Sequence, residues 1–176
     1  NFSGRSEQLA RLRQDRSRSE IESIVSVSVL HGLGGVGKSQ LAMEYAHMEG
    51  KACGMVWWVD AKTEASLYAG YGALAAALGL SLRDCKRRVA VLAFVREWLE
   101  RNPSWILILD DAEDPASIGS FVPVTGKGHV VVTSRNPSWR AVTASVLEVP
   151  VLDRLDSLAF ISRRLGRDDP DGSSLA

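Results

Sequence analysis

The sequence has little cysteine, no excess of charge of either sign and no long hydrophobic run. Its two cysteines, Cys53 and Cys85, lie far apart without metal-ligand spacing, so we interpret them as reduced thiols of a reducing, cytoplasmic compartment. Basic and acidic residues number 21 each, which excludes an electrostatic case for direct nucleic-acid or membrane contact. No stretch approaches the roughly 18 apolar residues of a membrane span, and no signal peptide is visible. The sequence begins at Asn1 rather than Met, so we interpret it as a segment of a longer protein.

The composition that remains is that of an ordinary globular domain, with 45% hydrophobic and 24% charged residues. Strands are predicted over residues 24–30, 55–60, 105–109, 128–135 and 145–152, and helices over residues 6–16, 39–48, 63–78, 86–101 and 153–166. Near-continuous apolar strands that alternate with helices indicate a parallel sheet covered on both faces. The predicted fold class is therefore α/β, with a five-stranded, mostly parallel sheet flanked by helices in three layers. Trp57 and Trp58 fall on opposite faces of the second strand, and we expect both in the core.

Residues 32–40, GLGGVGKSQ, follow the first predicted strand and match two nucleotide-binding fingerprints. The dinucleotide fingerprint G-x-G-x-x-G takes Gly32, Gly34 and Gly37, whereas the P-loop fingerprint G-x-x-x-x-G-K-[ST] takes Gly32, Gly37, Lys38 and Ser39. Asp60 favours the dinucleotide interpretation, because such folds keep a ribose-binding acid at the end of the second strand. Lys38 and Ser39 have no use in that fold, so we favour the P-loop, in a three-layer P-loop NTPase fold.

A P-loop binds phosphate with backbone N–H groups and with the positive end of the following helix. In that arrangement Lys38 would bridge the β- and γ-phosphates of a nucleotide, and the Ser39 hydroxyl would be a ligand of Mg²⁺. The predicted phosphate-binding residues are Gly34, Gly35, Val36, Gly37, Lys38, Ser39 and Gln40.

Three charged residues at the ends of later strands complete the candidate site, because ligands of open parallel sheets bind beyond the carboxyl ends of the strands. Asp110 follows the apolar run ILIL and is expected to hold Mg²⁺ together with Ser39. Asp111 is placed to orient or deprotonate an attacking water. Arg135 ends the next strand, where it could contact the γ-phosphate. The alternatives are a turn or helix cap for the acids and a solvated charge for the arginine.

These motifs together resemble the NB-ARC domain, the nucleotide switch of STAND-class signalling NTPases. The segments that carry the resemblance are NFSGR (1–5), GLGGVGKSQLAMEYA (32–46), VWWVDA (56–61), WILILDDAED (105–114) and HVVVTSRNPSW (129–139). The sequences of these segments most resemble those of bacterial NB-ARC proteins that carry tetratricopeptide repeats. The resemblance implies a domain over residues 1–166, and a linker-like tail over residues 167–176 that leads toward a helical subdomain absent from this sequence.

The resemblance also implies roles and partners. The strand bearing the sensor arginine would lie between the two Walker strands, and the segment with Phe2 and Arg5 would pack beside the adenine. Lys38, Ser39, Asp110, Asp111 and Arg135 match the Walker A, Walker B and sensor positions. Such proteins hold ADP at rest, and exchange for ATP permits self-association and signalling through linked effector and repeat domains. The family's downstream Gly-x-Pro motif and its ADP-contacting histidine have no counterpart in this sequence.

Two functional hypotheses follow. The first is an ATP/ADP–Mg²⁺ switch with slow hydrolysis, a regulatory module of a larger signalling or transcription-regulating protein. The second is a catalyst that turns over continuously, either an ATPase or a small-molecule kinase. The sequence favours the switch, because no second substrate-binding constellation is visible.

Overall fold

The computed structural model describes residues 5–81, 87–141, 143, 145–151 and 154. The helices are α1 (Ser6–Glu22), α2 (Lys38–Glu49), α3 (Glu64–Ala77), α4 (Arg88–Arg101) and α5 (Pro115–Ile118), with 3-10 turns η1 (Gly50–Ala52) and η3 (Pro137–Ala141). The strands are β1 (Ser26–His31), β2 (Met55–Asp60), β3 (Trp105–Asp110), β4 (Gly128–Ser134) and β5 (Ser145–Glu148). The predicted order of elements is confirmed through β5. The predicted helix over 153–166, apart from residue 154, lies outside the described residues, as do Phe2 and the tail.

The five strands form one sheet in the order β2-β3-β4-β1-β5, and every neighbouring pair is parallel. The register pairs Asp60 with Asp110, and it pairs His31 with both Ser134 and Glu148. All five carboxyl ends therefore reach the same edge of the sheet. Strand β4 lies between β1 and β3, which is the order that the NB-ARC resemblance implied.

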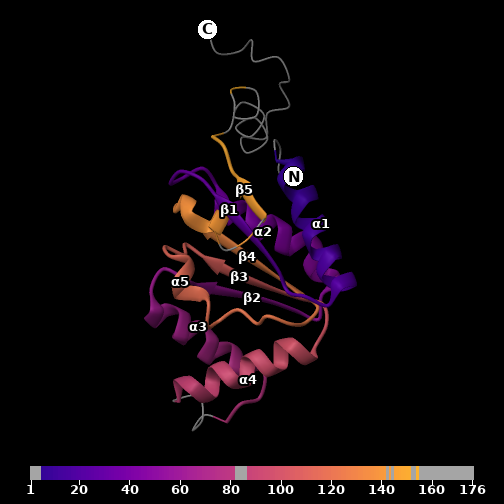
Figure 1. Ribbon diagram of the computed structural model, residues 1–176, viewed down its shortest axis with the longest axis vertical. Helices are drawn as coiled ribbons and strands as arrows, with labels where there is room; N and C mark the ends of the chain where they lie inside the picture. Colours follow the sequence, from indigo (N-terminus) through magenta and orange to yellow (C-terminus); the bar gives the residue numbers. More distant parts are fainter. Residues whose placement is uncertain (1–4, 82–86, 142, 144, 152–153, 155–176) are drawn as a thin grey trace, which may run out of the picture.

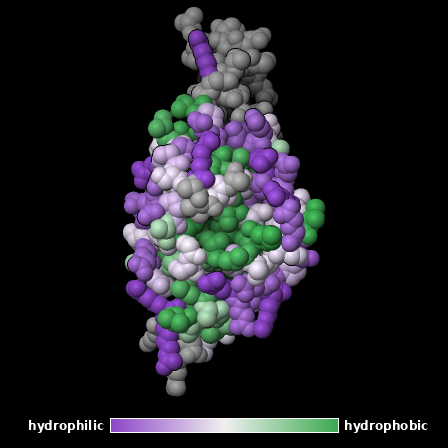
Figure 2. All heavy atoms as spheres, in the orientation of Figure 1, coloured by the Kyte–Doolittle hydropathy of each residue, from purple (hydrophilic) through white to green (hydrophobic). Residues whose placement is uncertain are grey.

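Helices cover both faces of the sheet (Figure 1). Strand β3 is apolar on both sides because its alternate side chains enter different cores. Ile106 and Ile108 pack in the core beneath α1 and α2, whereas Leu107 and Leu109 pack in the core beneath α3 and α4. The face seen in Figure 2 is mostly hydrophilic around a central hollow where hydrophobic residues gather. No helix among the described residues is both long enough and apolar enough to span a membrane.

Close packing at the amino ends of β3 and β4, opposite the glycine loop, fixes where β4 begins. Gly128 lies against the indole of Trp105, and a Cβ on this glycine would be 2.0 Å from Cε2 of that ring. Trp105 is fully buried and its indole N–H donates to the carbonyl of Leu99 in α4 at 2.8 Å. Strands β3 and β4 and helix α4 are therefore locked together at this point.

Three predictions of local structure were wrong. Helix α1 continues six residues beyond residue 16, and β5 ends at Glu148 rather than at residue 152. The last backbone bond from this segment to β1 runs from the Val149 N–H to the carbonyl of His31 at 2.7 Å, because β1 itself ends at His31 and gives way to the glycine loop. Trp58 is 37% exposed on the edge strand β2 and does not join the core, whereas Trp57 is half-buried and donates to the carbonyl of Gly70 at 3.3 Å.

Candidate nucleotide-binding site

The glycine-rich loop between β1 and α2 adopts a conformation that larger residues would strain. Gly35 and Gly37 have φ of 79° and 88°, in the left-handed region that favours glycine. Gly32 lies so close to the end of β5 that a Cβ would be 2.5 Å from the carbonyl oxygen of Val149. Gly35 has no atom within 4 Å of the corresponding position. The loop is thus held against β5 at its start and is open to solvent at Gly35.

Lys38 begins α2 and turns its ammonium group back into the loop. Its Nζ donates to the carbonyl oxygens of Gly32 at 2.9 Å and Leu33 at 2.8 Å, and the residue is only 8% exposed. Burial, and then the nearby charge of Arg135, lower the pKa of the Lys38 ammonium from its usual value. The cation therefore lies inside the loop, within reach of any anion that the loop amides bind.

A hydroxyl, a carboxylate and a second hydroxyl meet beside the loop. Ser39 Oγ donates to Oδ1 of Asp110 at 2.7 Å, and Thr133 Oγ1 donates to the same oxygen at 2.6 Å. Thr133 Oγ1 also accepts from the backbone N–H of Asp111 at 2.9 Å. The sequence prediction paired Ser39 with Asp110 but gave Thr133 no role. The sequence did offer a signal, because Thr133 is a hydroxyl residue at the carboxyl end of a strand, two residues before Arg135.

Asp111 and Arg135 form an ion pair at the same edge of the sheet. Arg135 Nη2 lies 3.5 Å from Asp111 Oδ1, and the two side chains are 55% and 39% exposed. Asp111 has a φ of 58°, which turns the chain sharply after β3. Arg135 also passes the loop, because its Cδ lies 3.9 Å from the position of a Cβ on Gly34. The structure therefore places both charges beside the loop.

Arg5 connects three segments around the loop. It is the N-cap residue of α1 and is 3% exposed. Its Nη2 donates to the carbonyl of Val36 in the loop and to the carbonyl of Pro150 after β5 at 3.3 Å. The guanidinium also lies about 3.6 Å from where a Cβ on Gly37 would be. Gln40, the remaining predicted residue of the described chain, is exposed in the first turn of α2.

A family model for the NB-ARC domain matches residues 6–169. The chain belongs to the NB-ARC domain family. Among curated proteins it is 26% identical to a "Nucleotide-binding leucine-rich repeat (NLR)-like protein" of Hyaloscypha variabilis, over 93% of this chain and 19% of that protein. It is 29% identical to "Regulatory protein AfsR" of Streptomyces griseus, over 96% of this chain and 18% of that protein. This NB-ARC domain therefore spans about a fifth of the length of these relatives.

Solved structures share the fold. Cdc6p of Pyrobaculum aerophilum superimposes with a TM-score of 0.70 at 17% identity, over 94% of this chain and 50% of the other. The ORC2 protein of Aeropyrum pernix, solved in ADPNP–ADP complexes, gives a TM-score of 0.67 at 12% identity, over 97% of this chain and 55% of the other. The predicted P-loop NTPase fold is thus confirmed, and membership of the NB-ARC family supports a nucleotide-binding regulatory module.

The dinucleotide interpretation is wrong for this NB-ARC domain. In dinucleotide-binding sheets the second strand lies next to the first, but here β3 and β4 separate β2 from β1. Asp60 is therefore remote from the glycine loop. Its Oδ1 accepts from the backbone N–H of Lys62 at 2.9 Å, so this acid stabilises a turn, as short acidic side chains commonly do.

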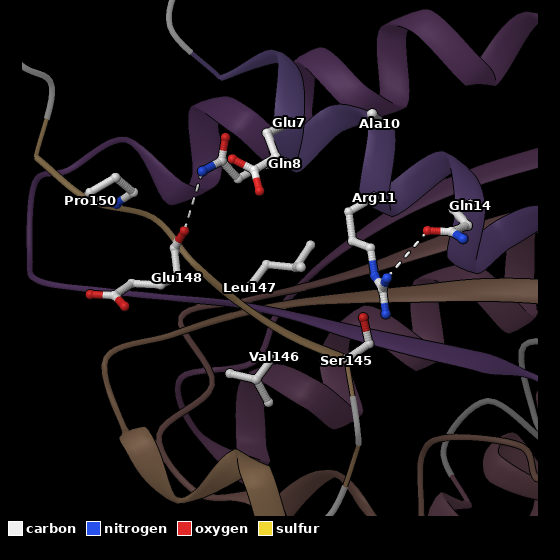
Figure 3. A pocket seen from close by; sticks show the side chains of 10 residues that line it. All are labelled: Glu7, Gln8, Ala10, Arg11, Gln14, Ser145, Val146, Leu147, Glu148 and Pro150. Atoms are coloured by element: carbon white, nitrogen blue, oxygen red, sulfur yellow. Dashed lines mark hydrogen bonds between the residues drawn. The ribbon is translucent and has the colours of Figure 1, made fainter.

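A groove of about 810 Å³ runs between α1 and β5 (Figure 3). Its lining residues are Glu7, Gln8, Ala10, Arg11, Gln14, Ser145, Val146, Leu147, Glu148 and Pro150. Gln8 reaches across one end, where its amide nitrogen lies 3.5 Å from the carbonyl of Glu148. That end adjoins Arg5, since Arg5 donates to the Pro150 carbonyl. No sequence motif marked this groove, because it arises from the packing of a polar helix beside an edge strand.

The residues present fit a nucleotide with Mg²⁺. The loop offers glycine conformations, a buried cation and the start of a 12-residue helix, which together favour phosphate. Ser39 and Asp110 offer a hydroxyl and a carboxylate oxygen 2.7 Å apart, and oxygens are the ligands of Mg²⁺. Among the described residues no three His, Cys, Asp or Glu side chains form a metal cluster. This suits a metal bound by one or two protein groups and by phosphate and water oxygens.

Proposed function

We propose that this NB-ARC domain binds ATP and ADP with Mg²⁺ and acts as a slowly hydrolysing switch in a larger regulatory protein. The observation that carries the proposal is the convergence of Lys38, Ser39 and Asp110 at one loop, with Asp111 and Arg135 beside them. The names of its relatives, an NLR-like protein and a regulatory protein, favour regulation over metabolism.

Each part of the loop has a separate task in this proposal. The amides of residues 34–37 and of Gln40 would bind phosphate oxygens, and Lys38 would neutralise the β- and γ-phosphates. Ser39 and Asp110 would hold Mg²⁺, which supplies further neutralisation of the phosphate charge. Arg5 and the adjoining end of the α1–β5 groove would bound the space for the base, together with the Phe2 segment.

Asp111 and Arg135 would act at the γ-phosphate. Asp111 would accept a hydrogen bond from the attacking water and receive its proton. In the structure Arg135 lies 3.5 Å from that carboxylate, so a water must share Asp111 with the guanidinium. Arg135 would contact the γ-phosphate when it is present. While Arg135 stays paired with Asp111, that carboxylate is less free to take the proton, which favours slow hydrolysis until Arg135 moves to the γ-phosphate.

We further propose that the domain is covalently linked to effector and repeat domains and self-associates when ATP is bound. The linked domains are supported by the length of the relatives, about five times that of this chain, and the self-association is what the resemblance to NB-ARC proteins implies. The formal net charge of the domain is zero, so charge alone gives it no attraction to nucleic acid or to an anionic membrane.

Turnover measured with the purified protein separates the switch from a continuous catalyst. We expect binding of Mg²⁺–ATP followed by a single slow turnover, with ADP retained. Asp111→Asn is the matched control, because it keeps the size of the side chain and removes its capacity to take a proton. Steady turnover at or above about one per second without an activator, or phosphate transfer to a small molecule, would contradict the switch.

A further inference from the structure

A chain of polar side chains lies buried between the sheet and helices α1 and α2. Tyr45 of α2 lies with its hydroxyl 2.7 Å from Nδ1 of His129 in β4, and Nε2 of that histidine lies 2.8 Å from Ser28 Oγ in β1. Ser28 Oγ donates to Oδ2 of Asp15 in α1 at 2.7 Å, and Ser145 of β5 donates to the same oxygen. Tyr45, Ser28 and His129 are fully buried. Five elements thus meet in one hydrogen-bonded chain.

The direction of every bond in this chain follows from its carboxylate end. The Ser28 hydroxyl has one hydrogen, which it gives to Asp15, so it must accept from His129 Nε2–H. Nδ1 of His129 is then without a proton and accepts from the Tyr45 hydroxyl. Burial lowers the pKa of His129 to about 4, which agrees with this neutral tautomer. The chain is fully satisfied and has one orientation.

Helix α2 is therefore tied to the sheet at two levels. Near its start, Ser39 donates to Asp110, which also accepts from Thr133 at the end of β4. Near its end, Tyr45 donates to His129 at the beginning of the same strand. His129 and Thr133 lie four residues apart in β4 and so face the same side of the sheet. The two ties share helix α2, and Thr133 links the Asp110 tie to β4.

In the proposed function, Mg²⁺ coordination would replace the Ser39–Asp110 bond, which we call the upper tie; the Tyr45–His129 bond is the lower tie. A Mg²⁺ ion held by Ser39 and Asp110 takes the same oxygens that form their hydrogen bond. Among the described residues, the bond between Tyr45 and His129 is then the side-chain hydrogen bond that still joins α2 to the sheet.

We propose that Tyr45 and His129 are positioning residues that hold the P-loop helix on β4, so that Ser39 stays opposite Asp110 when Mg²⁺–nucleotide binds. This inference rests on the proposed nucleotide binding. It predicts that the lower tie contributes to the part of nucleotide affinity that depends on Mg²⁺. The part supplied by loop amides and Lys38 needs less exact placement of Ser39.

Tyr45→Phe tests the inference against the matched variant Tyr71→Phe. Tyr71 is also fully buried, and its hydroxyl donates to the carbonyl of Phe121 at 2.7 Å in the core on the other side of the sheet. ADP affinity is titrated by calorimetry for both variants, with Mg²⁺ and with EDTA. We expect Tyr45→Phe to lower affinity about fivefold or more with Mg²⁺ and less than about twofold in EDTA. Tyr71→Phe should change neither value.

A double variant, Tyr45→Phe with His129→Leu, removes both partners of the bond, so that Nδ1 is not left as an unpaired buried acceptor, while the Ser28 hydroxyl keeps its bond to Asp15. It should show the same selective loss of Mg²⁺-dependent affinity. Equal effects of Tyr45→Phe and Tyr71→Phe, equal losses with and without Mg²⁺, or normal affinity in the double variant would each overturn the positioning role. If the unaltered protein binds no ADP at all, the proposed function fails and this inference fails with it.

Discussion

Replacing Lys38 with alanine removes the positive charge that lies inside the glycine loop. In the structure this ammonium is 8% exposed and is held by two loop carbonyls at 2.8 and 2.9 Å. The ammonium at this position would lie within contact distance of a phosphate bound by the loop. The alanine variant keeps the loop glycines and the helix start, so it tests the cation separately from the amides.

The expected magnitude follows from Coulomb's law. One pair of unit charges about 4 Å apart is worth about 4 kcal/mol at an effective dielectric constant of about 20. That corresponds to a loss of about a thousandfold in nucleotide affinity. The pKa of Lys38 is lowered by burial and by Arg135, so its charge is lost at a lower pH than that of an exposed lysine. The affinity of the unaltered protein should therefore begin to fall below the usual lysine range as pH rises.

Calorimetric titration with Mg²⁺–ADP measures the loss. The control is Lys51→Ala, which removes the same charge from an exposed position in η1 and should leave affinity unchanged. Circular dichroism confirms that both variants are folded. If Lys38→Ala retains affinity within about threefold of the unaltered protein, far less than the value from Coulomb's law, the assignment of the phosphate site is refuted.

Three further predictions concern catalysis and stability. Asp111→Asn should leave ADP affinity intact but slow single-turnover hydrolysis of ATP by about a hundredfold or more; normal hydrolysis would exclude Asp111 as the base. His129 has a folded-state pKa of about 4, below the unfolded value of about 6.5, so its stabilisation is complete above pH 6.5 and is lost as pH falls. Urea unfolding should show a decrease of about 3 kcal/mol between pH 7 and pH 4, and His129→Gln should flatten that profile. Gly128→Ala forces a methyl group against Trp105 and should lower the free energy of unfolding by about 3 kcal/mol, whereas Gly72→Ala, which meets no atom within 4 Å in α3, should raise it by about 0.5 kcal/mol.

The sequence predicted the elements where burial has a regular pattern. Strands β3 and β4 are apolar runs buried almost throughout, so their composition identifies them. The end of α1 was missed, because its last two turns are polar and are held by distant partners. Ser19 donates to the carbonyl of Gly128, and Arg16 pairs with Glu49 at 2.7 Å. Contacts so far apart in sequence leave no local pattern.

The candidate site was predictable to a similar extent. The rule that ligands bind beyond the carboxyl ends of strands brought Lys38, Asp110 and Arg135 together before the structure was known. The order of the strands came from the family resemblance, since periodicity does not determine which strands are neighbours. His129 has no metal-ligand spacing with His31 or His47, so no sequence motif marks it. Its hydrogen bonds to Tyr45 and Ser28 span most of the chain and are visible only in the fold.

Nucleotide binding is tested most directly by two titrations of the purified protein, one with Mg²⁺–ADP and one with NAD. We expect saturable binding of ADP at one site, weakened by EDTA, and no binding of NAD. Binding of NAD without binding of ADP, or no binding of either, would contradict this expectation.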